Sequence, residues 1–149
     1  MDMQAQVLTA METLEQYSTA EELVNSLPTK VGYKGHFKAL AKEQLGGEVF
    51  LGVATGNIGG IDVVGTKKDA SSTGIMVITN KRILFITKLL WMTKVDSVGW
   101  SKFDSYSAQK GMIFGTINVM TSSSNSIKVS GIDKNVWQQA KNTLDAIML

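Results

Sequence analysis

The stretch GIMVITNKRILFITK, residues 74–88, decides the fold of this chain. Two runs rich in aliphatic and aromatic residues flank Asn80-Lys81, which predicts a β-hairpin that turns at these two residues. Successive strand side chains point to opposite faces. One face is expected to carry Ile75, Val77, Leu84 and Ile86, and the other Met76, Ile78, Ile83 and Phe85. Because both faces are apolar, we expect a helix to cover the outside of the sheet.

Further strands surround this hairpin. One is expected to begin at Glu48 in EVFLGVATG, with Val49, Leu51 and Val53 on one side. The others are expected around residues 94–100, 103–107, 111–120 and 126–131, separated by turn-rich segments. The fold class is therefore mainly β, with about seven short antiparallel strands.

The chain ends in a predicted amphipathic helix. Asp133 is its expected N-cap, and Ile132 before it pairs with Trp137 inside it as a hydrophobic staple. Its apolar stripe consists of Val136, Trp137, Ala140, Leu144, Ile147 and Met148. This helix is expected to cap one end of the strands.

The residues before Glu48 have helical rather than strand periodicity. A first helix carries Met3, Val7, Met11 and Leu14 on one face. A second is expected to start at Ser18, with Glu21 completing a capping box, and to stop at Pro28. A third is expected from Gly35 or His36 to Leu45, ended by Gly46-Gly47. We therefore divide the chain into an N-terminal helical segment, 1–47, and a β-domain with its helix, 48–149.

Composition bounds the class of protein. The chain has 149 residues, 44% hydrophobic and 19% charged, which suits a globular domain with one core. It has no cysteine, which excludes disulfides, thiolate metal sites and a cysteine nucleophile, and suits the cytoplasm. The start MDMQAQVLTAME is not a signal peptide, and no apolar run approaches the roughly 18 residues of a membrane span.

Charge divides the chain unevenly. Residues 1–27 contain five acidic residues and no Lys or Arg, a net charge of −5, so the remainder carries +7. One interpretation is that the acidic N-terminal segment rests against the basic body. The alternative is that the acidic residues form the solvated face of a helix.

Three stretches resemble a known family. They are the hairpin at 74–87, the segment KVDSVGWSKFDSYSAQKGMIFGTINV at 94–119, and IKVSGIDKNVWQQ at 127–139. Their order and spacing resemble the bacterial pleckstrin-homology-like (PH-like) family known as YokE-like PH domains, over roughly residues 43–147. The resemblance implies a PH-like barrel or sandwich with a C-terminal capping helix. It implies no single activity, because such domains bind lipids, peptides or proteins, or act as assembly modules.

Catalytic signatures are missing from the sequence. His36 is the one histidine and has no nearby carboxylate, so we interpret it as a surface or helix-start residue. The acidic residues lack metal-ligand spacing, and the glycines at 56–65 match neither a dinucleotide fingerprint nor a P-loop. We expect a protein that is not an enzyme, with no catalytic residue, metal or cofactor.

Three surfaces are candidates for binding. Lys67 and Lys68 in a long loop, with Lys81 and Arg82 in the hairpin turn, are the candidates for anionic headgroups, the alternative being a solubilising role. Leu89, Leu90, Trp91 and Met92 form a candidate interface if exposed, the alternative being a place in the core. Lys30, Lys34, Lys38 and Lys42 share one helix face, either solvated or facing a polyanion.

The sequence thus predicts a non-enzymatic PH-like interaction module that works by protein–protein contact or self-association. The alternative is peripheral binding to an anionic membrane surface. A nucleic-acid partner is not expected, because the positive charge is diffuse and no aromatic–basic motif accompanies it.

Overall fold

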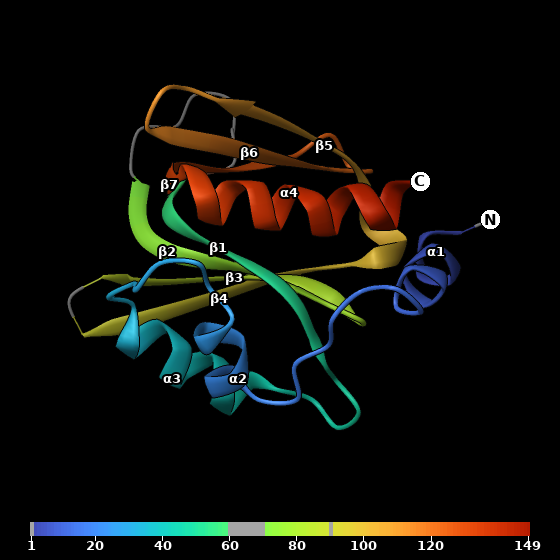
Figure 1. Cartoon of the computed structure of the whole chain (residues 1–149), viewed down its shortest axis with the longest axis horizontal. Coiled ribbons are helices and arrows are strands. Elements are labelled where there is room, and N and C mark those ends of the chain that lie inside the picture. The colour runs from blue at the N-terminus through green and yellow to red at the C-terminus, as the bar shows by residue number, and fades with distance from the viewer. Residues whose placement is uncertain (1, 60–70, 90) are drawn as a thin grey trace.

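The computed structural model describes residues 2–59, 71–89 and 91–149 (Figure 1). Seven strands form one antiparallel sheet in the order β4-β3-β2-β1-β7-β6-β5. The strands are β1 (Phe50–Gly59), β2 (Ser71–Thr79), β3 (Arg82–Leu89), β4 (Met92–Gly99), β5 (Phe103–Lys110), β6 (Phe114–Thr121) and β7 (Ser126–Asp133). β1 joins the two halves of the sheet, since it pairs with β2 along its length and with β7 near its end. The expected fold class is confirmed.

Four α-helices surround the sheet. They are α1 (Met3–Ala10), α2 (Ala20–Asn25), α3 (Lys34–Glu43) and α4 (Lys134–Met148), and a 3-10 turn, η1 (Trp100–Lys102), joins β4 to β5. Figure 1 shows α4 lying across the two halves of the sheet, α2 and α3 beneath the β1–β4 half, and α1 beside the end of α4. The helices before β1 therefore fold back on the strands. The boundary at residue 47 stays a prediction.

The inner core lies between α4 and the strands. Its members include the Met76, Ile78, Ile83 and Phe85 face of the hairpin and the apolar stripe of α4. Asp133 caps α4 as predicted, because its carboxylate accepts from the backbone N–H of Asn135 and of Val136. The indole of Trp137 is buried and donates to the carbonyl of Thr116 on β6 at 3.0 Å. Apolar burial and one satisfied polar group thus hold α4 on the sheet.

A second core covers the outside of the β1–β4 half. Ile75, Val77, Leu84 and Ile86 face it, as the alternation of the hairpin predicted. The covering side chains are Leu23 of α2 and Phe37 and Leu40 of α3. Leu23 and Leu40 are fully buried, and each contributes roughly 1.5–3 kcal/mol by leaving water. The expected helical cover is therefore supplied by the residues before β1.

The start of β1 differs from the prediction. The pairing register with β2 shifts between Phe50 and Gly52, which marks a β-bulge. Leu51 faces the inner core, whereas Val53 faces the outer one, so the prediction of Val49, Leu51 and Val53 on one side is wrong. The bulge turns Gly52 toward α4, where an added Cβ would lie 2.9 Å from the Thr143 hydroxyl. Close approach of α4 explains the glycine here.

Helix ends in the N-terminal segment also differ. α1 stops at Ala10 rather than near Leu14, and the chain after it is extended at Tyr17, which exchanges backbone hydrogen bonds with Phe50. The N-cap of α2 is Thr19, not Ser18, and its hydroxyl accepts from the N–H of Glu22. α3 ends at Glu43, before the expected Leu45.

Candidate interaction surfaces

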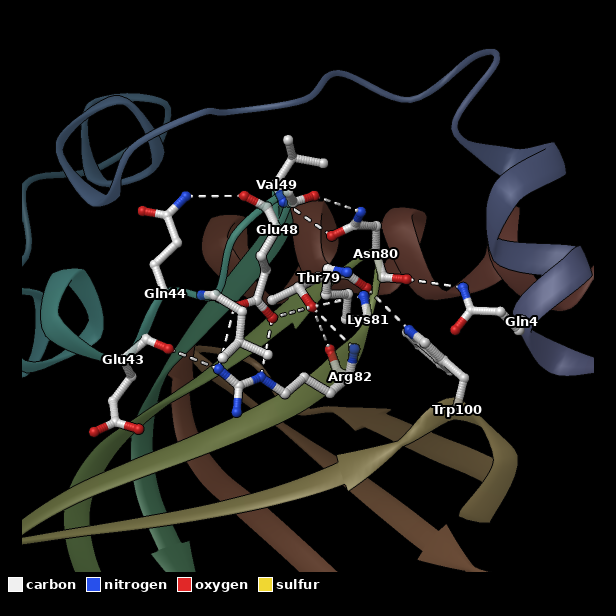
Figure 2. A network of polar contacts seen from close by, with 12 residues as sticks. Gln4, Glu43, Gln44, Glu48, Val49, Thr79, Asn80, Lys81, Arg82 and Trp100 are labelled. Atoms are coloured by element: carbon white, nitrogen blue, oxygen red, sulfur yellow. Dashed lines mark hydrogen bonds and ion pairs between the residues drawn. The ribbon is translucent and has the colours of Figure 1, made fainter.

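The turn between β2 and β3 is held by its own side chains (Figure 2). The Thr79 hydroxyl accepts from the backbone N–H of Lys81 and of Arg82, each at 2.9 Å. The same hydroxyl donates to a carboxylate oxygen of Glu48 at 2.8 Å. The sequence TNKR at 79–82 is therefore a self-bonded turn whose side chains reach back to the chain before β1.

Arg82 forms a buried ion pair with Glu48. Its Nε lies 3.0 Å and its Nη2 3.1 Å from the two carboxylate oxygens, and Nη2 also donates to the Glu43 carbonyl at 2.8 Å. The Glu48 side chain has 0% exposure. Burial alone would raise the pKa of Glu48, but the hydrogen bonds from Arg82, the Leu45 N–H and Thr79 outweigh it and lower the pKa. Glu48 is therefore held ionised.

Asn80 completes this clamp. Its side-chain oxygen accepts from the Val49 N–H at 2.9 Å, and its amide donates to the Gly47 carbonyl at 3.1 Å. Its backbone carbonyl accepts from Gln4 of α1 at 2.9 Å. The β2–β3 turn therefore holds both the residues that precede β1 and the helix α1. We call residues 79–82 with Glu48 the polar clamp.

The polar clamp determines which of the four cations predicted to bind anions are available. Arg82 is occupied by Glu48, whereas the Lys81 side chain is exposed. Lys67 and Lys68 lie outside the described residues. They belong to the β1–β2 connection, and this connection meets β2 at the end opposite the β2–β3 turn. Since β2 has nine residues, its ends are about 26 Å apart.

The turn between β3 and β4 presents apolar side chains to solvent. Trp91 is 88% exposed and Met92 61% exposed, so the alternative that places them in the core is wrong for these two residues. Leu90 and the side chain of Leu89 lie outside the described part of the chain. Trp and Met are enriched at protein interfaces, so this turn remains a candidate interface.

A second apolar turn differs from the prediction. Met112 is 92%, Ile113 64% and Phe114 56% exposed, in and beside the turn between β5 and β6. These residues were predicted to lie in a strand spanning 111–120. The glycines on either side of Met112-Ile113-Phe114 were the available signal, and Gly111 closes the turn by donating to the Phe114 carbonyl at 2.8 Å.

Figure 1 shows the β3–β4 and β5–β6 turns at the end of the molecule opposite α1 and η1. We call their exposed side chains the apolar hairpin end: Trp91, Met92, Met112, Ile113 and Phe114.

A groove with a basic lining runs between α3 and the β3–β4 pair. It encloses about 350 Å³ and is lined by Lys38, Lys42 and Glu43 of α3 and by Lys88, Thr93 and Val95 of the strands. Gly35 also lines it, and a Cβ there would lie 3.1 Å from the Lys88 ammonium. We call this the lysine groove. Lys30 lies before α3 and outside this lining.

His36 is buried behind the groove, which corrects its expected surface position. It is 8% exposed, its ring Nε2 lies 3.1 Å from the Thr73 carbonyl, and its ring packs against Tyr33. Burial lowers the pKa of His36 more than the bond to Thr73 raises it, and the Lys88 ammonium lowers it further. His36 therefore stays neutral and joins α3 to β2.

A second cluster of titratable groups joins β5 to α4. The Tyr106 hydroxyl of β5 donates to Asp145 of α4, whose carboxylate also binds Lys141 at 2.6 Å. Burial and the adjacent Asp145 raise the pKa of Tyr106. Within residues 2–59, 71–89 and 91–149, no three His, Cys, Asp or Glu side chains gather as metal ligands do. Over the same residues, no helix is both long and apolar enough to span a membrane.

Comparison with known proteins places the chain in a family. A family model described as a bacterial PH domain matches residues 56–146. The chain belongs to this family. The solved PH domain of USP37 is similar to this PH domain at 10% identity and a TM-score of 0.48, covering 64% of this chain and 94% of that one.

A second solved structure, the C-terminal domain of an unknown protein from Leishmania infantum, matches this PH domain at 16% identity and a TM-score of 0.48. It covers 78% of this chain and 95% of that one. No curated protein matches the chain.

Proposed function

We propose that this PH domain is a non-enzymatic interaction module of the YokE-like kind, and that it contacts other protein molecules, its own copies included. PH domains generally mediate protein or lipid interactions. The observation that carries the proposal is the apolar hairpin end, where five large apolar side chains are more than half exposed. Large apolar side chains exposed on two turns are candidates for contact surfaces, because a folded domain otherwise keeps such groups out of water.

The energetics favour such a contact. Trp, Phe and Met are enriched at protein interfaces, and Trp is among the residues that contribute most to binding energy. Both turns are anchored on paired strands, so little conformational entropy is lost when they bind. Burying one large apolar side chain of this kind contributes roughly 1.5–3 kcal/mol.

Sedimentation velocity of the full chain tests self-association. We expect reversible association that rises with concentration. The double variants Trp91→Ser with Met92→Ser, and Met112→Ser with Phe114→Ser, should each weaken it about tenfold, since about 1.4 kcal/mol is tenfold in affinity. Leu8→Ser is the matched control, because Leu8 is 55% exposed on α1 at the other end. A wild-type chain that stays monomeric at high concentration would overturn self-association.

Binding to anionic lipid headgroups is the second candidate function. The observation that favours it is that Lys88 of β3 and Lys94 of β4 flank Trp91 and Met92 in the chain, although Lys94 also lies 3.7 Å from the Asp96 carboxylate. Aromatic side chains between cations suit the interface of an anionic membrane. This candidate includes the headgroup-binding role of Lys67, Lys68 and Lys81, whereas Arg82 is already paired with Glu48.

Co-sedimentation with vesicles tests this second candidate. Binding to phosphatidylserine vesicles at low salt, absent with neutral phosphatidylcholine vesicles, would support it, because salt screens such attraction. Lys67→Ala with Lys68→Ala should weaken that binding more than Lys81→Ala, if the loop carries the site. No binding at low salt would remove the lipid hypothesis.

A further inference from the structure

β4 has an open backbone edge. Among the described residues it pairs with β3 alone and ends the sheet on that side. Most of its side chains are exposed, and Val98 is its one buried residue. The outward N–H and C=O groups of an edge strand can bond to an added strand.

The pairing register shows which residues offer those groups. Leu89 pairs with Met92 across a two-residue loop, and no shift interrupts the ladder from there to Gly99. Residues that flank such a loop bond to each other, and bonded pairs then alternate along the strands. Lys94 and Asp96 therefore bond toward β3. Thr93, Val95 and Ser97 direct their backbone groups outward.

The lysine groove lies beside this edge. Thr93 and Val95 belong to its lining, so the groove occupies the same face of β4 as α3. Lys38, Lys42 and Lys88 contribute three positive charges to the lining, and Glu43 contributes one negative charge. A strand added beside β4 would place every second side chain over this groove. Acidic side chains fit there, because opposite charges attract across a partly dehydrated surface.

We propose that β4 accepts an extended acidic segment of a partner protein as an eighth strand, with alternate Asp or Glu side chains in the lysine groove. This inference rests on the proposed function as an interaction module but uses a different surface. A second copy is disfavoured as the occupant. Two-fold pairing of β4 with itself would bring Lys38 and Lys42 of both copies together, and like charges repel.

The test uses the full-length protein and a blocked peptide of about four Glu-Val repeats, an alternating acidic strand. Isothermal titration should show binding, whereas a Lys-Val peptide of equal length should not bind. Lys38→Glu with Lys42→Glu should weaken binding about tenfold or more. The matched control is Lys128→Glu, an exposed lysine on β7, which should change affinity about twofold or less.

Amide hydrogen exchange by NMR distinguishes strand addition from simple charge attraction. The peptide should slow exchange at Thr93, Val95 and Ser97 about tenfold or more, with little change at Lys94 and Asp96, which already bond to β3. A Glu-Pro peptide has the same charge but lacks N–H groups at its prolines. Equal binding by that peptide, without protection of β4, would overturn the proposal.

Two other results would also overturn it. If phosphatidylserine vesicles protect the β4 amides and the peptide does not bind, the groove belongs to lipid. If the peptide fails to bind while the chain still self-associates through the apolar hairpin end, strand addition is wrong and the proposed function stands. If the peptide binds while the wild-type chain stays monomeric, strand addition at β4 stands and self-association through the apolar hairpin end is wrong.

Discussion

The two turns that flank β3 are both short, yet their side chains point in opposite directions, inward at one turn and into solvent at the other. At the β2–β3 turn, Thr79, Asn80 and Arg82 direct their polar atoms inward to Glu48 and to the backbone before β1. At the β3–β4 turn, Trp91 and Met92 project into solvent. The turn with the most family-like sequence therefore serves the fold, and the other is free to meet a partner.

The physical reason is the cost of leaving buried polar groups unpaired. Glu48, Thr79 and Arg82 bond to one another in the polar clamp, so removing one of them leaves polar groups of the others without a partner. Such a network has one arrangement and tolerates little change. Trp91 and Met92 have no such constraint, because both side chains lie largely in solvent.

The largest effect is expected from Arg82→Met. This change leaves the buried Glu48 carboxylate without its cation, which typically costs about 3–5 kcal/mol. Urea unfolding followed by circular dichroism measures it. Lys81→Met is the control, since the Lys81 side chain is exposed and should change stability by about 0.5 kcal/mol or less. Equal losses for the two variants would contradict a structural role for the clamp.

A smaller loss is expected from Asn80→Ala. This variant removes the side-chain bonds to the Val49 N–H and the Gly47 carbonyl. At about 1 kcal/mol for each bond, the free energy of unfolding should fall by about 2 kcal/mol. Hydrogen exchange should also quicken at the Val49 amide and remain unchanged at the β3–β4 turn. A uniform change along the chain would count against a local clamp.

The next smaller effect is expected from acid, which should reduce the stability that Glu48 contributes through the polar clamp. The pKa of Glu48 in the folded protein lies below its usual value of 4.5, so the unfolded chain binds a proton before the folded chain does. The stabilisation from Glu48 is complete above about pH 4.5 and is lost as the pH falls through the lowered pKa. Unfolding curves across this range should show a smaller acid-induced loss for Glu48→Gln. An unchanged pH profile would show that the carboxylate does not control acid stability.

The smallest effect on stability is expected from Trp91→Ser. Because Trp91 is 88% exposed, the free energy of unfolding should change by about 0.5 kcal/mol or less. Iodide should quench wild-type fluorescence through Trp91, whereas buried Trp100 remains shielded. Loss of most quenching in the variant confirms the exposure. A large loss of stability would show that Trp91 is packed, and the β3–β4 turn would then serve the fold as the β2–β3 turn does.

Much of the fold follows from local pattern. The alternation in GIMVITNKRILFITK correctly predicted which hairpin side chains face each core. Asp133 and the stripe of α4 were also predictable, since a cap and a helical period are short-range features. Val49 and Leu51 share the inner side as predicted, but Val53 faces the outer core, because the bulge in β1 depends on pairing with β2. His36 lies at the start of its helix as predicted, but its predicted surface position was wrong because its burial depends on β2 and Tyr33, which lie outside its helix.

The candidate surfaces were only partly predictable. Trp91 and Met92 were recognised as interface candidates if exposed, and the structure exposes them. Met112, Ile113 and Phe114 were assigned to a strand, because an apolar run between glycines has the same composition in a strand and in a turn. The Glu48–Arg82 pair joins residues 34 positions apart, so no local pattern revealed it.

The sequence by itself determined the strand order along the chain, the two-faced hairpin and the capping helix, since these depend on periodicity and on residues a few positions apart. Tertiary structure alone decided that Arg82 is occupied, that His36 is buried, and that the lysines of α3 stand beside the open edge of β4. Burial and pairing depend on contacts between distant segments. The stretch TNKRILF was one part of the pattern that predicted a PH-like fold, whereas its role in the polar clamp depends on Glu48, which is distant in the sequence.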